Sequence, residues 1–166
     1  MKKIAVVYWS GTGNTAAMAD AVAEGIQGAG GEAEKITAAD FNESVAGNFD
    51  AYAFGCPSMG VEVLEESEFE PMWQSIKGSL GQKPVGLFGS YGWGDGEWMR
   101  NWEEDCKAGG LNMASDPVIC NESPLPATLR TARSCIGRTS RPVTVSRSSS
   151  GMTTSKIGRA SCRERV

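Results

Sequence analysis

Apolar residues along the first 122 positions fall into two kinds of block, which alternate. Nearly continuous apolar runs lie at 2–9, 50–56 and 83–91, and two shorter segments, at 32–36 and 116–122, are also predicted as strands. Such runs are typical of strands buried on both faces of a sheet. Segments at 16–26, 69–80 and 96–110 carry apolar residues at helical spacing and predict covering helices. The alternation predicts an α/β fold, with a doubly wound, five-stranded parallel sheet joined by right-handed crossovers.

The pattern changes at residue 123, where helical and alternating periodicity both stop. Residues 1–122 hold seven Lys and Arg against 19 Asp and Glu, a net charge of −12. Residues 123–166 hold nine basic residues against one acidic residue, a net charge of +8. A basic arm for nucleic acid is one interpretation, but no aromatic residues or recognisable motif accompany the arginines. The other is a lost reading frame, because the end "IGRASCRERV" resembles a translated sequencing adapter. We expect a folded domain at 1–122 and an aberrant, disordered tail at 123–166.

Composition excludes several classes of protein. The chain has no His, which removes the nucleophile mechanisms that pair Ser or Cys with His. Its five Cys form no C-x-x-C pair, and no metal site is predicted. The start "MKKIAVVYWSGTG" is basic and then apolar, but it passes directly into a glycine turn, unlike a signal peptide. No run approaches the roughly 18 apolar residues of a membrane helix. We expect a cytoplasmic protein without a membrane partner.

Four segments follow the predicted strands, at 10–15, 57–62, 90–95 and 121–122. In a doubly wound sheet the ligand lies beyond the carboxyl ends of the strands, so these segments are the candidate site. The first, "SGTGNT", leads into a helix N-terminus, where free N–H groups favour an anion. Its hydroxyls and glycines suit a terminal phosphate monoester. It lacks the Gly-Lys-Ser/Thr end of a Walker loop. A dinucleotide fingerprint through Gly11, Gly13 and Ala16, or a plain capped turn, stays possible from this loop alone.

The next two segments point to a planar ligand. "SYGWGDG" places Trp93 between glycines, where it is poorly placed for the core and well placed to stack on a ring. "PSMGVE" offers Met59, a polarisable side chain that could cover the opposite face. A phosphate loop combined with these two side chains implies a planar, phosphorylated cofactor, and FMN fits that description.

The motifs "YWSGTGNT", "MGVEVLEESEFEP" and "FGSYGWGDGEWMR" resemble the three FMN loops of the flavodoxins, in particular the short-chain type of anaerobes. The resemblance implies a sheet order of 2-1-3-4-5, a phosphate held without a cationic side chain, and a ring between Met59 and Trp93. It further implies that the Gly60 peptide flips on one-electron reduction, that Glu62 bonds the flavin N3–H, and that Asp95 and Asn121 lie near the ring. The FMN-binding residues expected on this basis are Ser10, Gly11, Thr12, Gly13, Asn14, Thr15, Pro57, Ser58, Met59, Gly60, Glu62, Ser90, Tyr91, Gly92, Trp93, Gly94, Asp95 and Asn121.

The chain departs from the family pattern in two places. Val61 replaces the polar residue common after the glycine, which affects the energetics of the peptide flip. The helix expected after the fifth strand is missing or replaced, so apolar sheet would be exposed.

The resemblance implies a monomeric one-electron carrier that moves between quinone, neutral semiquinone and hydroquinone. The acids Glu62, Asp95 and Glu97 and the net charge of −12 disfavour the anionic last state, so a low potential is expected. The acidic run from Glu62 to Glu70 is either a solvated helix start or a docking surface for basic redox partners. An NAD(P)H-dependent FMN quinone reductase on the same fold is the alternative. Nucleic acid is not an expected partner.

Overall fold

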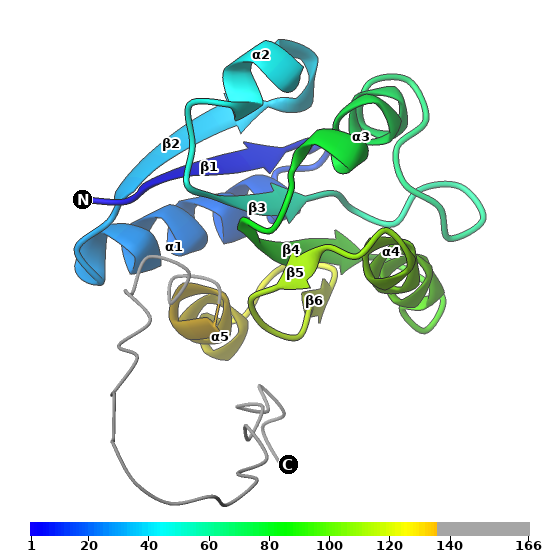
Figure 1. Cartoon of the computed structure of the whole chain (residues 1–166). Coiled ribbons are helices and arrows are strands. Elements are labelled where there is room, and N and C mark those ends of the chain that lie inside the picture. Colours follow the sequence, from blue (N-terminus) through cyan, green and yellow to red (C-terminus); the bar gives the residue numbers. More distant parts are fainter. Residues whose placement is uncertain (136–166) are drawn as a thin grey trace, which may run out of the picture.

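In the computed structural model, which describes residues 1–135, the strands of the protein form one sheet (Figure 1). Its strands are β1 (Lys3–Tyr8), β2 (Glu32–Thr37), β3 (Ala51–Gly55), β4 (Pro84–Tyr91), β5 (Asn112–Met113) and β6 (Val118–Asn121). All paired strands are parallel, in the order β2-β1-β3-β4-β5, with β6 also paired to β4. The predicted parallel sheet and its order are confirmed.

The fifth position of the sheet is divided between two short strands. β5 pairs with the start of β4, at Pro84 and Val85, and β6 pairs with its end, from Phe88 to Tyr91. Only the second part, β6, was predicted from the sequence. Pro117 precedes β6 and has no N–H to donate, so it cannot extend a regular ladder. The result is that β6 carries Asn121 to the level of Tyr91, at the carboxyl edge of the sheet.

Helices cover both faces of the sheet (Figure 1). They are α1 (Asn14–Gly28), α2 (Glu43–Ala46), α3 (Phe69–Ile76), α4 (Glu97–Ala108) and α5 (Pro126–Cys135), with 3-10 turns η1 (Ala38–Asp40) and η2 (Lys77–Ser79). One core contains Phe54, Trp73 and Trp102, under α3 and α4. The other contains Val6 and Ile26, under α1 and α5. Two separate cores on one sheet are what a doubly wound fold requires.

The final helix was expected to be missing or replaced, and the first of these is wrong for residues 126–135, which form α5 beside α1. Ala132 is fully buried in the core under α1, and Leu129 packs against that core. The backbones approach closely: a Cβ on Gly25 would lie 2.1 Å from the carbonyl oxygen of Arg133. Arg133 also forms an ion pair with Glu24. Small residues therefore allow this short helix to cover the sheet. Residues 136–166, the rest of the predicted tail, lie outside the described residues.

Candidate functional site

A pocket of about 470 Å³ lies at the carboxyl edge of the sheet, beside the ends of β1, β3, β4 and β6. That volume falls in the range of small-molecule sites, about 300–1,000 Å³. Its lining comes from four segments that are distant in sequence: Trp9, Ser10, Gly11, Thr12, Asn14, Thr15, Pro57, Ser58, Met59, Ser90, Tyr91, Gly92, Glu122 and Ser123. The four predicted segments thus meet at one place.

The Ser10 loop (residues 10–15) turns from β1 into α1. Ser10 Oγ accepts hydrogen bonds from the N–H groups of Gly13, at 3.1 Å, and Ala16, at 3.3 Å. Gly13 has a φ of 95°, a left-handed conformation that suits glycine. The first N–H groups of a helix lack intrahelical acceptors and carry its positive dipole end. With no Lys or Arg in the loop, this arrangement suits a phosphate bound through neutral donors.

A pair of buried hydroxyls connects this loop to the end of β4. Thr15 Oγ1 lies 3.1 Å from Ser90 Oγ, within hydrogen-bond distance, and the two residues are 1% and 5% exposed. The Thr15 hydroxyl therefore has a partner inside the protein. Both residues line the pocket, so their contact fixes the position of α1 relative to β4 on the side that faces the ligand.

The Met59 hairpin (residues 59–63) is closed by two backbone hydrogen bonds. Met59 and Val63 each donate an N–H to the carbonyl of the other, at 2.9 Å. Between them, Gly60 and Glu62 have positive φ values of 51° and 56°. Val61, at the tip, is 81% exposed. The hairpin therefore holds its ends rigidly and presents an apolar tip beside the pocket.

The Trp93 loop (residues 90–96) runs from β4 to α4 and supplies the second apolar side chain at this edge. Trp93 is 61% exposed and Met59 is 37% exposed, although both are large hydrophobic residues. Exposed apolar side chains on two facing loops are typical of a binding site rather than of the core.

A carboxylate from the Met59 hairpin caps α4. Glu62 Oε1 accepts hydrogen bonds from the N–H groups of Asp95, Gly96 and Glu97, at 3.2, 3.1 and 3.0 Å. The predicted residue Asp95 instead forms an ion pair with Arg100, at 2.7 Å, and Arg100 donates to its carbonyl. Asp95 and, to a smaller extent, Glu62 and Glu97 raise the pKa of Arg100. Arg100 was not predicted as a neighbour of these acids.

The acidic run does not act as one surface. Glu65 is only 6% exposed, and its carboxylate accepts hydrogen bonds from Ser67, Glu68 and Phe69 at 2.8–2.9 Å. Burial by itself raises the pKa of Glu65, but these N–H groups outweigh it and hold the pKa below its ordinary value. Glu65 is therefore a structural cap of α3. In contrast, Glu66 and Glu70 line a second pocket, of about 390 Å³, between α3 and α4.

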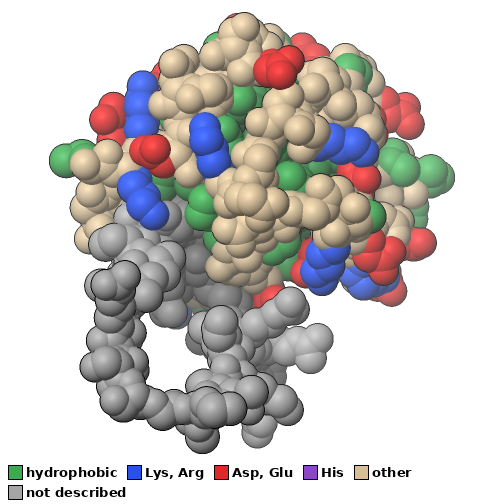
Figure 2. Space-filling view, viewed as in Figure 1, with side chains coloured by type: hydrophobic (Ala, Val, Ile, Leu, Met, Phe, Trp, Pro, Cys, Tyr) green, Lys and Arg blue, Asp and Glu red, His purple; other side chains and the backbone are tan. Residues whose placement is uncertain are grey.

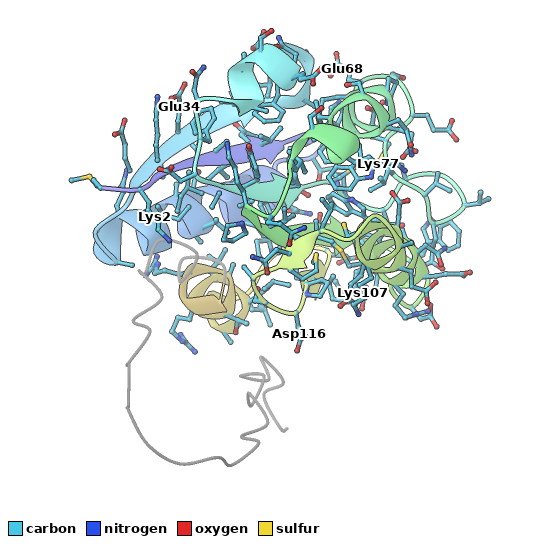
Figure 3. The ribbon with its side chains drawn as sticks, in the orientation of Figure 1. Lys2, Glu34, Glu68, Lys77, Lys107 and Asp116 are labelled. Atoms are coloured by element: carbon cyan, nitrogen blue, oxygen red, sulfur yellow. The ribbon has the colours of Figure 1, made fainter. Side chains whose placement is uncertain are left out.

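An ion pair also joins η2, which directly follows α3, to α4. Lys77 pairs with Asp105, at 3.0 Å, and lies between α3 and α4 in Figure 3. Burial raises the pKa of Asp105, and its contacts with Trp73 and Lys77 outweigh that effect and lower it. On the face shown in Figure 2, acidic and basic side chains are interspersed over the described residues. No helix in the described part of the chain is long and apolar enough to cross a membrane.

Eleven of the 18 predicted site residues line the pocket. The others surround it on the same loops: Gly13, Gly60, Glu62, Trp93, Gly94, Asp95 and Asn121. Trp9, Glu122 and Ser123 line the pocket but were not among the predicted residues. Glu122 belongs to the fourth segment that the sequence analysis placed at this edge, and its position after β6 was the available signal. Trp9 was predicted as the last residue of the first strand, so nothing marked it as a site residue.

A doubly wound parallel sheet with a pocket of this kind at its carboxyl edge is typical of nucleotide-binding α/β proteins. The family model described as flavodoxin matches residues 6–134. The chain belongs to the flavodoxin family. It is 47% identical to the flavodoxin of Clostridium beijerinckii over 119 residues, which cover 72% of this chain and 86% of that protein. It is 41% identical to the flavodoxin of Megasphaera elsdenii over 121 residues, which cover 73% and 88%.

The solved structures agree with this assignment. The chain is similar to the solution structure of two-electron reduced Megasphaera elsdenii flavodoxin, with a TM-score of 0.74 and 38% identity, covering 81% of this chain and 98% of that one. Flavodoxins are electron carriers that use a flavin. The predicted resemblance and the predicted electron-transfer role, without substrate turnover, are therefore confirmed. The alternative of a quinone reductase is not favoured.

Proposed function

We propose that the chain is a low-potential, one-electron carrier that binds FMN in the pocket at the carboxyl edge of the sheet. The observation that carries the proposal is the Ser10 loop, where hydroxyls and helix N–H groups gather without a cationic side chain beside two exposed, apolar loop residues. A single terminal phosphate and a planar ring match that combination. FMN supplies the redox chemistry when bound, and the protein sets its position and surroundings.

Different side chains would contact different parts of the FMN. The Ser10 loop would hold the phosphate, while Met59 and Trp93 would cover opposite faces of the ring and exclude water from it. Glu62 Oε1 is engaged by the α4 N–H groups, which leaves Oε2 to accept the imide N–H of the ring. Gly60, in a left-handed conformation at the hairpin, is the residue whose peptide could turn most easily toward the ring. The other predicted residues of the three loops would complete the site.

The charges near the loops support a low potential. Glu62, Asp95 and Glu97 bring carboxylate oxygens within 4.8 Å of one another, and Arg100 pairs with Asp95. The described residues up to 122 carry a net charge of −12. Like charges disfavour a further negative charge on the ligand. The last electron added to the site should therefore require a strong donor, which makes the reduced protein a strong reductant.

The negative net charge of residues 1–122 also suits redox partners with basic docking surfaces. Glu66 and Glu70 line a groove that includes Glu62, so part of the acidic run is available beside the site. Attraction between opposite charges speeds encounter, and salt weakens it. We propose that the chain works as a cytoplasmic monomer, and that its electron-transfer rate with a basic partner falls as the salt concentration rises.

The test is a reductive titration of the purified full chain mixed with FMN and freed of excess. Retained flavin absorption, a transient long-wavelength band during the titration and final bleaching are the expected results. A chain that stays colourless after mixing with FMN would overturn the proposal. Steady oxidation of NADH or NADPH by the flavin-loaded protein alone would instead favour the reductase.

A further inference from the structure

Glu62 connects the two loops that carry Met59 and Trp93. Its side chain leaves the Met59 hairpin and reaches the N-terminal end of α4. There one oxygen accepts hydrogen bonds from the backbone N–H groups of Asp95 and Gly96, which precede the helix, and of Glu97, its first residue. The backbone of Glu62 has a φ of 56°, which non-glycine residues seldom adopt. An unfavourable backbone conformation combined with three hydrogen bonds indicates that the surroundings hold this side chain in place.

Gly94 has no side chain, and the carboxylate of Glu62 occupies the space that a side chain there would need. A Cβ on Gly94 would lie 2.3 Å from Glu62 Cδ, 2.4 Å from Oε1 and 2.7 Å from Oε2, all too close for real atoms. Gly94 follows Trp93 directly, and Glu62 stands three residues after Met59. Contact between Glu62 and Gly94 therefore fixes how closely the Met59 hairpin can approach the Trp93 loop.

We propose that Glu62 and Gly94 are positioning residues that set the width of the opening between Met59 and Trp93. The inference rests on the proposed function, because the opening is the space that the FMN ring would occupy. Gly94 acts only through the carboxylate of Glu62: a side chain at 94 pushes the carboxylate off α4, and the hairpin then loses its connection to the Trp93 loop. A purely direct contact of Glu62 with the ring would leave Gly94 without this role.

A double-mutant cycle on FMN affinity separates these two possibilities. Gly94→Ala, Glu62→Ala and the double variant are titrated with FMN in the full chain, and the quenching of flavin fluorescence gives Kd. We expect Gly94→Ala alone to weaken binding roughly tenfold, equivalent to about 1.4 kcal/mol. In the Glu62→Ala background, the same change should weaken binding by less than about twofold, because the group it displaces is absent. Equal effects of Gly94→Ala in both backgrounds would overturn the proposal.

Two further variants complete the design. Gly110 has a φ of 71° and nothing within 4 Å of a built Cβ, so Gly110→Ala introduces the same kind of backbone strain without the contact. It should leave Kd unchanged, and a weakening equal to that of Gly94→Ala would assign the effect to strain. Glu62→Gln keeps an acceptor for the α4 N–H groups and should bind FMN more tightly than Glu62→Ala.

Hydrogen exchange in the FMN-free protein tests the contact independently of any cofactor. The amides of Asp95, Gly96 and Glu97 should exchange faster in Glu62→Ala and in Gly94→Ala than in the parent chain, while the amide of Trp102 should not change. Unaltered exchange at the three amides would overturn the contact even if FMN binds. If the parent chain binds no FMN, the proposed function and the positioning role both fail, and faster exchange still shows that Glu62 caps α4.

Discussion

Replacing Glu65 by Gln should destabilise the fold although the variant is almost identical in shape. The carboxylate accepts three N–H groups at 2.8–2.9 Å, and Phe69, one of the donors, is fully buried. Losing a capping side chain costs about 0.5–2 kcal/mol, and hydrogen bonds to charged groups contribute about 1.5–3 kcal/mol each. Glutamine keeps one acceptor oxygen, but its NH₂ group replaces the other carboxylate oxygen. That NH₂ group is a donor and faces backbone N–H groups that are also donors. We expect a loss of about 2 kcal/mol at pH 7.

The loss should depend on pH in a defined direction. The pKa of Glu65 is lowered in the folded protein, so its charge contributes stability above the ordinary glutamate pKa, about 4.3. That contribution disappears as the pH falls through the lowered pKa, because the side chain then becomes neutral like Gln. Urea unfolding of both chains at several pH values measures the difference. It should be complete at pH 7 and become small in acid.

Glu66→Gln is the matched control, because Glu66 is the exposed neighbour of Glu65 and lines the groove between α3 and α4. It should leave stability unchanged and should flatten the salt dependence of electron transfer to a basic partner, which Glu65→Gln should not do. A Glu65→Gln chain as stable as the parent at pH 7, or a stability difference that grows in acid, would refute the capping role.

Three other changes give distinct readouts. Trp93→Ala should weaken FMN binding roughly 30-fold, about 2 kcal/mol of lost ring contact, in a fluorescence titration; an unchanged Kd would contradict its stacking role. Arg100→Gln removes the cation paired with Asp95 and should make the potential for the last electron more negative in a spectroelectrochemical titration, by less in high salt; a shift to a more positive value would be inconsistent with the charge argument. Gly25→Ala, which places a Cβ against the Arg133 carbonyl, should cost about 1–3 kcal/mol in urea unfolding, and no loss would show that α5 does not pack there.

Much of the fold could be predicted because its central strands, β1, β3 and β4, are buried on both faces. Val6 and Phe54 lie in runs that have no other suitable place in a globular protein, and both are fully buried. Two segments, β5 and α5, were not predicted correctly, and each takes its structure because of the segments packed against it. β5 has only two residues, and it pairs because the start of β4 is already in place. α5 has a composition of Ser, Thr and Arg that masks its apolar side, and its helix forms where Gly25 allows close packing.

The candidate site was also predicted only in part. The residue types and their position after each strand were visible in the sequence, since parallel strands bring their carboxyl ends to one edge. The side-chain partners within the loops were not. Glu62 accepts a hydrogen bond from Asp95, 33 residues away, at the N-terminal end of α4. Glu65, in the same acidic run, turns inward and caps α3. Which of several acids in a run points inward depends on the backbone conformation of the hairpin, which the sequence pattern does not encode.

The hydroxyl pair between Thr15 and Ser90 has a practical consequence for exchanging parts between related carriers. Each of these side chains has its partner on a segment 75 positions distant, so neither segment is an independent module. A chimera that imports the glycine turn of a relative without the matching end of β4 would leave a buried oxygen facing a foreign group. Recombination designs should therefore move such segments as pairs.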